Sequence, residues 1–206
     1  MTLRRTLALA GTVGLLLLGT LAEAKPLTWK IDPNHSRVSF SIRHIFSKVP
    51  GTFDAFSGTI QFDPEKPAAA STQIEIDAKS INTNVERRDN DLRSANLFDV
   101  EKYPTLSFAS TGVKDLGNGK LEIAGNLTMH GVTKPVTLDA TLLGSGPGMS
   151  GETRAGFEAT TTIDRKQFGI IWNRQLDQGT LLGDDVAIRI DIEAVAQPED
   201  TSQSKK

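Results

Sequence analysis

Three histidines, at positions 35, 44 and 130, are the side chains of this sequence best suited to metal binding or proton transfer. His35 and His44 are nine residues apart, and an odd spacing within one strand places two side chains on opposite faces. His130 stands alone before Gly131, as a turn residue would. A three-histidine site would require a bend between the first two, so we expect no metal and no cofactor.

Asp89 and Asp91 form the second chemically suggestive group, because two nearby carboxylates can act as acid and base. Residues at i and i+2 of a helix do not face each other, so this pair is poorly placed for joint catalysis. The sequence contains no cysteine, no G-x-S-x-G elbow and no H-E-x-x-H motif. We therefore expect no catalytic residues and a protein that is not an enzyme; an exported enzyme that uses the histidines is one alternative.

The polar segment that carries these acids, residues 87–98 (RRDNDLRSANLF), is the one part of the chain with a convincing helical pattern. Asn84 is a suitable N-cap, and Pro104 prevents the helix from continuing further. The side chains expected near one helical face are Val85, Arg88, Asp89, Leu92 and Ala95. The sequence predicts a short helix between strands.

Most of the remaining chain alternates apolar and polar residues with a period of two, which is typical of strands with one buried face. The clearest example is residues 186–194 (VAIRIDIEA). Similar segments are 38–42, 58–63, 74–76, 105–110, 121–125, 136–142 and 156–163, with turn signals at 63–64, 117–119 and 144–148. About eight antiparallel strands result, and we expect a mainly β protein closed into a barrel because closure removes exposed strand edges.

Composition limits the classes of partner. The chain has 206 residues, a net charge of -2 and a pI near 5.9, which disfavours nucleic-acid binding. Residues 1–24 have the basic start, apolar run and Ala22-Glu23-Ala24 ending of a signal peptide, so we expect cleavage after Ala24 and a periplasmic or secreted protein. We expect one barrel domain over 25–196, a disordered tail over 197–206, and no membrane-spanning segment.

Several separate motifs along the chain resemble those of one known family. They are HSRVSF at 35–40, GTFDAFSGTIQFD at 51–63, RRDNDLRSANLFDVEKYPTLSFAST at 87–111, NLTMHGVTKPV at 126–136 and DRKQFGI at 164–170. In this order they resemble the YceI-like family over nearly the whole chain that follows the signal peptide. Where we expect R-D-x-H-L-R-S, however, Asp91 replaces the histidine, so no role of that histidine can be transferred.

The resemblance implies an elongated, lipocalin-like antiparallel barrel with a helical segment over one side and an apolar interior that holds a long lipid, typically a polyisoprenoid. It implies an exported protein that sequesters or carries a polyprenyl phosphate, a quinone or a similar amphiphile. A filled barrel that serves as a stress-related interaction module without a ligand is a further alternative. A homodimer would also be compatible with an exposed apolar mouth.

Two sets of candidate site residues follow. For the ligand head group they are Arg88, Asp89, Arg43, His44 and Trp172. For the ligand tail they are Phe40, Ile42, Phe53, Phe56, Phe62, Ile76, Leu92, Phe98, Phe108, Leu127, Phe157 and Ile171. Arg88 and Asp89 have an equally good structural explanation, in which they pair with loop groups and brace the helix on the barrel.

Overall fold

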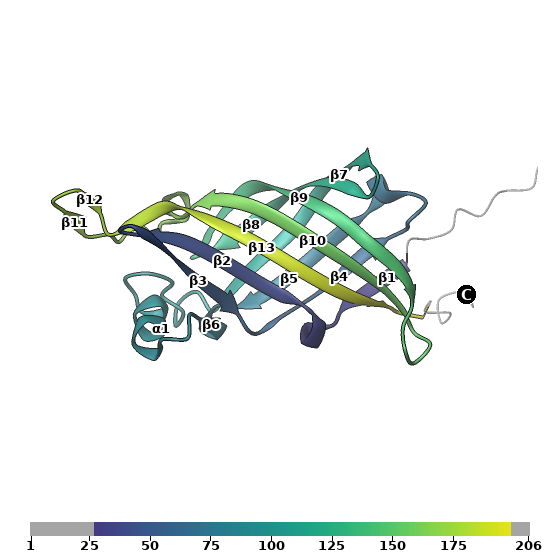
Figure 1. The fold of residues 1–206 in the computed structure, drawn as a ribbon, viewed down its shortest axis with the longest axis horizontal. Coiled ribbons are helices and arrows are strands. Elements are labelled where there is room, and N and C mark those ends of the chain that lie inside the picture. Colours follow the sequence, from purple (N-terminus) through teal and green to yellow (C-terminus); the bar gives the residue numbers. More distant parts are fainter. Residues whose placement is uncertain (1–26, 199–206) are drawn as a thin grey trace, which may run out of the picture.

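Eight antiparallel strands form a closed ring in the computed structural model, which describes residues 27–198 (Figure 1). In order around the ring they are β1 (Leu27–Ile31), β4 (Phe56–Phe62), β5 (Ser71–Asp77), β7 (Thr105–Gly117), β8 (Lys120–Met129), β9 (Val132–Pro147), β10 (Thr153–Asp164) and β13 (Leu182–Ala196). The ring closes because β1 pairs with both β4 and β13. The predicted mainly β barrel is confirmed.

At one end of the barrel, three further strands extend the wall. They are β2 (Arg37–His44), β3 (Ser47–Phe53) and β6 (Ile81–Asn82). β2 pairs with the first part of β13, β3 pairs with β2, and β6 pairs only with β3. The 3-10 turn η1 (Pro33–His35) separates β1 from β2, so that one long β13 has two successive partners.

Residues 83–104 cross the space between β6 and β7 and contain the single α-helix of the described chain, α1 (Glu86–Arg93). Leu92, Leu97, Phe98 and Val100 of this segment pack into the core cluster that also contains Leu106 at the start of β7. The wall at this end is therefore completed by side-chain packing. The short elements η2 (Pro67–Ala69), η3 (Ala78–Ser80), η4 (Arg165–Phe168), β11 (Gln175–Leu176) and β12 (Gly179–Thr180) complete the described structure.

The pairing of β13 with β2 shows how the alternation of apolar and polar residues gives the wall an apolar inner face and a polar outer face. Val186 lies opposite Ile42, Ile188 opposite Phe40, and Ile190 opposite Val38, so apolar residues share the inner face. Arg189, from the alternate set, forms ion pairs with Glu158 and Asp191 on the outer face. One face meets water and the other meets the lumen.

Two local predictions are wrong. Asn84 is not the N-cap, because its φ of 60° places it in the left-handed region that Asn tolerates, and Val85 holds the cap position. The turn expected at 144–148 begins only at Gly148, because β9 continues to Pro147 and Gly144 pairs with Gly156 beside a β-bulge. Glycine favours bulges as well as turns, so the sequence alone did not separate the two.

The signal peptide expected at 1–24 lies outside the described residues, as do residues 199–206 of the expected tail. The first tail residue, Gln197, is described and donates its backbone N–H to the carbonyl of Thr28 at 2.7 Å. Within residues 27–198, no helix has the length and apolar character needed to cross a bilayer.

Candidate ligand-binding cavity

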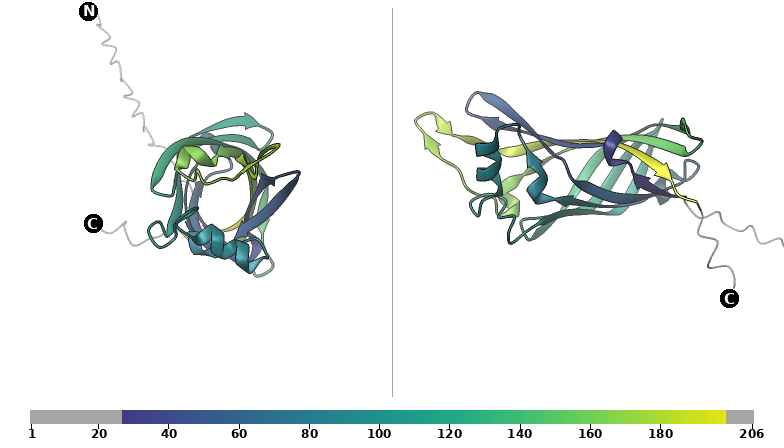
Figure 2. Two further views of the ribbon diagram at one scale, coloured as in Figure 1. Left: turned by 90° about the vertical axis from the view of Figure 1, so that its left-hand side faces the viewer. Right: turned by 90° about the horizontal axis from the view of Figure 1, so that it is seen from below.

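The barrel encloses a cavity of about 690 Å³ along its long axis. Viewed end-on, the strands form a ring and α1 lies across one side of its rim (Figure 2). Inner-face residues such as Ile74, Ile76 and Ile188 line the cavity and are only partly buried, although they point away from bulk solvent. A filled core would bury them completely, so the interior is hollow.

Two glycines allow aromatic rings to lie flat against the cavity wall. A Cβ atom placed on Gly125 would lie 2.3 Å from Cζ of Phe108, and one on Gly51 would lie 2.3 Å from Cζ of Phe40. Both distances are far below van der Waals contact, so each ring occupies the space that a side chain on the neighbouring strand would need. The rings thereby cover the wall without filling the lumen.

The end of the barrel opposite α1 is closed by an aromatic cluster. Trp29 and Phe62 are each 1% exposed, and the indole Nε1–H of Trp29 donates to the carbonyl of Phe62 at 3.0 Å. Phe157 meets Phe62 edge to face with ring centroids 5.3 Å apart. Phe62 and Phe157 also line the cavity, so this cluster forms its floor.

At the α1 end, a short hydrogen-bond chain fixes the helix to the wall. The hydroxyl and backbone N–H of Thr83 both donate to Oδ1 of Asp89, at 2.5 and 2.9 Å. The guanidinium of Arg88 donates from Nε to the Thr83 hydroxyl at 2.7 Å and from Nη2 to the Thr83 carbonyl at 2.9 Å. Asp89 is 5% exposed and does not line the cavity, so it braces the helix.

Arg165 holds the loop on the other side of the same opening. Although it is charged, it is 4% exposed, and burial lowers the pKa of its guanidinium. Nε donates to the carbonyl of Gly183 at 2.9 Å, and Nη1 donates to the carbonyls of Ile170 and Trp172 at 2.7 and 2.8 Å. One buried cation therefore ties residues 170–172 to the start of β13.

The rim between these two segments is polar. His44, Arg87, Arg88 and Asp91 all line the cavity. Arg88 keeps Nη1 without a hydrogen bond to the described chain, and Arg87 is exposed with no ion pair within residues 27–198. The cavity thus has an apolar body, an apolar floor and cations at its mouth, which suits an amphiphile with a long tail and a polar head.

The histidines do not meet in the part of the chain that the structure describes. His130 occupies a turn with φ of 52°, its ring packs against Tyr103 at 4.7 Å, and its Nδ1 lies 3.2 Å from the carbonyl of Phe168. This agrees with the predicted turn role. His44 lines the cavity mouth, whereas His35 belongs to a separate group on the outside of the barrel.

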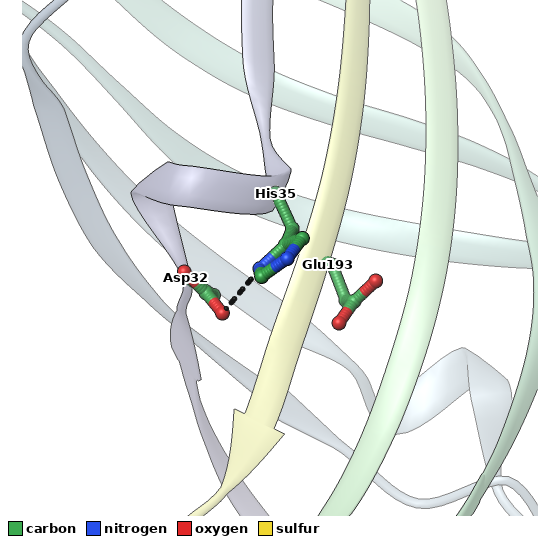
Figure 3. A group of neighbouring side chains, drawn as sticks. All are labelled: Asp32, His35 and Glu193. Atoms are coloured by element: carbon green, nitrogen blue, oxygen red, sulfur yellow. Dashed lines mark hydrogen bonds and ion pairs between the residues drawn. The ribbon is translucent and has the colours of Figure 1, made fainter. Parts of the chain in front are cut away.

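That outer group contains Asp32, His35 and Glu193, whose potential ligand atoms lie within 4.8 Å of one another (Figure 3). Nη1 of Arg154 binds Oδ2 of Asp32 at 2.9 Å and also binds Glu193. Hydrogen bonds from His35 and Arg154 lower the pKa of Asp32 to about 2. The guanidinium of Arg154 already bridges these two carboxylates, so the group joins η1, β10 and β13 rather than offering a metal site.

Comparison with known proteins identifies the family. A family model described as the YceI-like domain matches residues 29–194. This chain belongs to the YceI-like family. Protein YceI of Salmonella arizonae is 45% identical over 157 residues, which cover 75% of this chain and 82% of that protein.

Solved structures show the same YceI-like architecture. BcnA of Burkholderia cenocepacia superposes with a TM-score of 0.72 at 26% identity, covering 79% of this chain and 98% of that one. A polyisoprenoid-binding domain from Saccharophagus degradans, implicated in plant cell wall breakdown, superposes with a TM-score of 0.62 at 18% identity, covering 83% and 99%. The second likeness concerns the fold alone.

The YceI-like barrel places most of the predicted tail residues on the cavity wall. Those that line it are Phe40, Ile42, Phe53, Phe62, Ile76, Leu92, Phe98, Phe108, Leu127 and Phe157. Phe56 does not line the cavity, because it packs against the core cluster opposite Ile76. Ile171 points outward and is 68% exposed, because the turn at Gly169, with φ of 80°, presents Ile170 to the interior instead.

The predicted head-group residues divide in a similar way. His44, Arg88 and Trp172 line the mouth, whereas Arg43 points outside and donates to the carbonyls of Ile45, Thr180 and Leu182. Arg165, Arg87 and Thr83 line the cavity without having been predicted. Their residue types did not indicate a place in the cavity, because threonine and arginine in polar segments usually lie on the surface.

Proposed function

We propose that this protein binds one long apolar lipid, of the polyisoprenoid or quinone type, inside the barrel and carries or sequesters it outside the cytoplasm. The observation that supports this most directly is the hollow apolar interior of about 690 Å³, closed at one end by the Trp29 cluster and polar at the other. The shared fold with a polyisoprenoid-binding domain points to the same class of ligand. The signal-like sequence at 1–24 supports export.

The size of the cavity sets the scale of the ligand. A methylene group occupies about 30 Å³ in a liquid, similar to a water molecule. The cavity of about 690 Å³ therefore holds about 20 to 25 carbons, which corresponds to about four to five isoprene units. Burial is worth about 0.8 kcal/mol per methylene, against about 1.5–3 kcal/mol for one charged hydrogen bond. The wall therefore supplies most of the affinity, and the rim orients the ligand.

Arg88 is the side chain that we assign to the head group. Its Nε and Nη2 atoms hold Thr83, which leaves Nη1 directed to a phosphate, hydroxyl or quinone oxygen at the mouth. Arg87 supplies a second cation beside it. No bond is made or broken in this function, so none of the histidines is assigned a catalytic role.

The test is native mass spectrometry of protein prepared from its own compartment without detergent, followed by extraction and identification of the lipid. We expect one isoprenoid lipid per chain. Protein that is empty, and that stays empty after incubation with polyprenyl phosphate and with a quinone, would overturn the proposal.

A matched pair of variants tests the location of the ligand. Leu127→Trp places a large ring in the lumen, whereas Asn126→Trp places the same ring on the outer face of the same strand. We expect the first variant to lose lipid and the second to keep it, with both remaining folded. Full lipid occupancy in both variants would show that the lipid lies outside the barrel.

A further inference from the structure

Four large apolar side chains stand in solvent around the mouth of the cavity. Phe46 is 89% exposed, Ile171 68%, Val85 46% and Trp172 40%. They belong to three separate segments, namely the β2–β3 turn, the entry to α1 and the loop after η4, which all lie at the same end of the barrel (Figures 1 and 2). Val85 and Trp172 also line the cavity, so these apolar groups surround its opening.

The β2–β3 turn places Phe46 in water at a conformational cost. His44 pairs with Ser47, so the turn contains only Ile45 and Phe46, and Ile45 has a φ of 51°. Turns of this length favour Gly or Asn, and a β-branched residue rarely adopts the left-handed region. Neither Ile nor Phe improves the folding of this turn, so the strained, apolar tip points to a function outside the barrel.

The turn is held firmly beside the loop after η4. The backbone N–H of Ile45 donates to the carbonyl of Leu181 at 2.9 Å, and the N–H of Leu181 donates to the carbonyl of Arg174 at 2.9 Å. Arg165 fixes the carbonyl of Trp172 in turn. Phe46 and Trp172 are therefore carried by a connected, hydrogen-bonded rim.

Positive charge accompanies Phe46, Ile171 and Trp172, whereas Val85 is followed directly by Glu86. Segments 43–49 (RHIFSKV) and 165–176 (RKQFGIIWNRQL) contain arginines and lysines but no aspartate or glutamate. Among residues 27–198, the side chains of Lys48 and Arg174 have no ion-pair or hydrogen-bond partner. Apolar side chains flanked by unpaired cations form the pattern that binds the interface of anionic membranes.

We propose that this end of the barrel docks on the surface of a bilayer that contains anionic lipids, with Phe46 and Trp172 entering the headgroup region and the cavity mouth facing the membrane. A second copy of the chain fits less well, because a symmetric contact would bring Lys48 and Arg174 against like charges. The docked orientation would let a lipid pass between bilayer and cavity without exposing its tail to water. The proposal goes beyond cargo binding, and its main readout is the binding of the protein to vesicles.

The two tryptophans of the chain provide a direct readout. Trp29 is 1% exposed at the barrel floor, so Trp29→Phe leaves Trp172 as the single indole. We expect vesicles of phosphatidylethanolamine and phosphatidylglycerol with brominated acyl chains to quench Trp172 and shift its emission to shorter wavelength. Flotation of the unaltered protein with the same vesicles gives an independent measure, which does not depend on the stability of the Trp29→Phe variant.

Phe46→Ser is the decisive variant. We expect its partitioning into vesicles to fall about tenfold, because most of a phenylalanine side chain is no longer buried. The matched control is Met149→Ser, which alters a fully exposed apolar residue in the β9–β10 turn at the opposite end and should bind like the parent. Both variants should keep the melting temperature and the lipid content of the parent, which separates docking from cargo binding.

The outcomes that overturn the proposal are distinct. The first is a parent protein that does not float with anionic vesicles. The second is an equal loss of vesicle binding in Phe46→Ser and Met149→Ser, and the third is Trp172 emission that brominated lipid neither quenches nor shifts. Concentration-dependent dimerisation that Phe46→Ser abolishes, without any vesicle binding by the parent, would assign the surface to a second copy instead.

Discussion

Replacing Arg165 by methionine tests whether one buried cation organises the mouth. Methionine matches the length of the aliphatic stem but removes the donors that bind the carbonyls of Ile170, Trp172 and Gly183. Each charged hydrogen bond contributes about 1.5–3 kcal/mol, but removal of the cation also removes its burial cost, and water can reach carbonyls near the rim. We expect a net loss of about 3 kcal/mol, the lower bound for breaking a buried charged contact.

For a chain of this size, each kcal/mol lowers the melting temperature by about 2–4 °C, so Arg165→Met should melt about 6–12 °C below the parent. Circular dichroism melts and the emission of Trp172 would report global and local loosening, respectively. The melting temperature of Arg165→Lys should fall between those of Arg165→Met and the parent, because an ammonium group keeps the charge but cannot form the same forked hydrogen bonds. Lys166→Met is the control, because the exposed Lys166–Asp184 pair is worth at most about 1 kcal/mol. A melting temperature for Arg165→Met within about 2 °C of the parent would refute this reasoning.

Two further predictions concern the wall and its outer brace. Gly125→Val should push the Phe108 ring into the lumen, cost about 1–3 kcal/mol and reduce lipid occupancy, since a Cβ there would lie 2.3 Å from the ring. Gly112→Val, which meets nothing within 4 Å, should be nearly neutral, and equal melting temperatures for the two variants would contradict the proposed contact. The pKa of Asp32 is about 2 in the folded protein against an ordinary value of 3.8, so its stabilising effect is present above pH 4 and is lost as the pH falls towards 2. Thermal melts between pH 2 and 7 should therefore show a smaller acid-induced loss of stability in Asp32→Asn than in the parent; parallel curves would count against this role.

Much of the wall could be predicted because its signal is local. In residues 186–194 every second side chain is apolar, and the structure places Val186, Ile188 and Ile190 on the inner face. The ring closure is less accessible to sequence, because β13 pairs with β2 along one part and with β1 along the other. That division depends on the break at η1, which only the assembled barrel reveals.

The site was predicted less completely, for similar reasons. Phe40 and Ile42 were assigned to the cavity because strand alternation fixes their direction, whereas Ile171 was assigned wrongly because the turn at Gly169 resets which side chain faces inward. Arg165 next to Lys166 resembles an exposed basic pair in the sequence. Its burial depends on carbonyls from residues 170, 172 and 183, which lie together only after folding.

The two ends of the barrel differ in how the wall is held together, and we expect them to differ in rigidity. Around the Trp29 floor, every neighbouring pair of strands is joined by a backbone ladder, which forms a hoop of fixed circumference. At the α1 end, β6 has no partner on its second side, and residues 83–104 span the remaining arc through packing and a few side-chain hydrogen bonds. An outward shift of this arc would break no strand ladder, so we expect any widening of the entrance to occur there while the floor keeps its diameter.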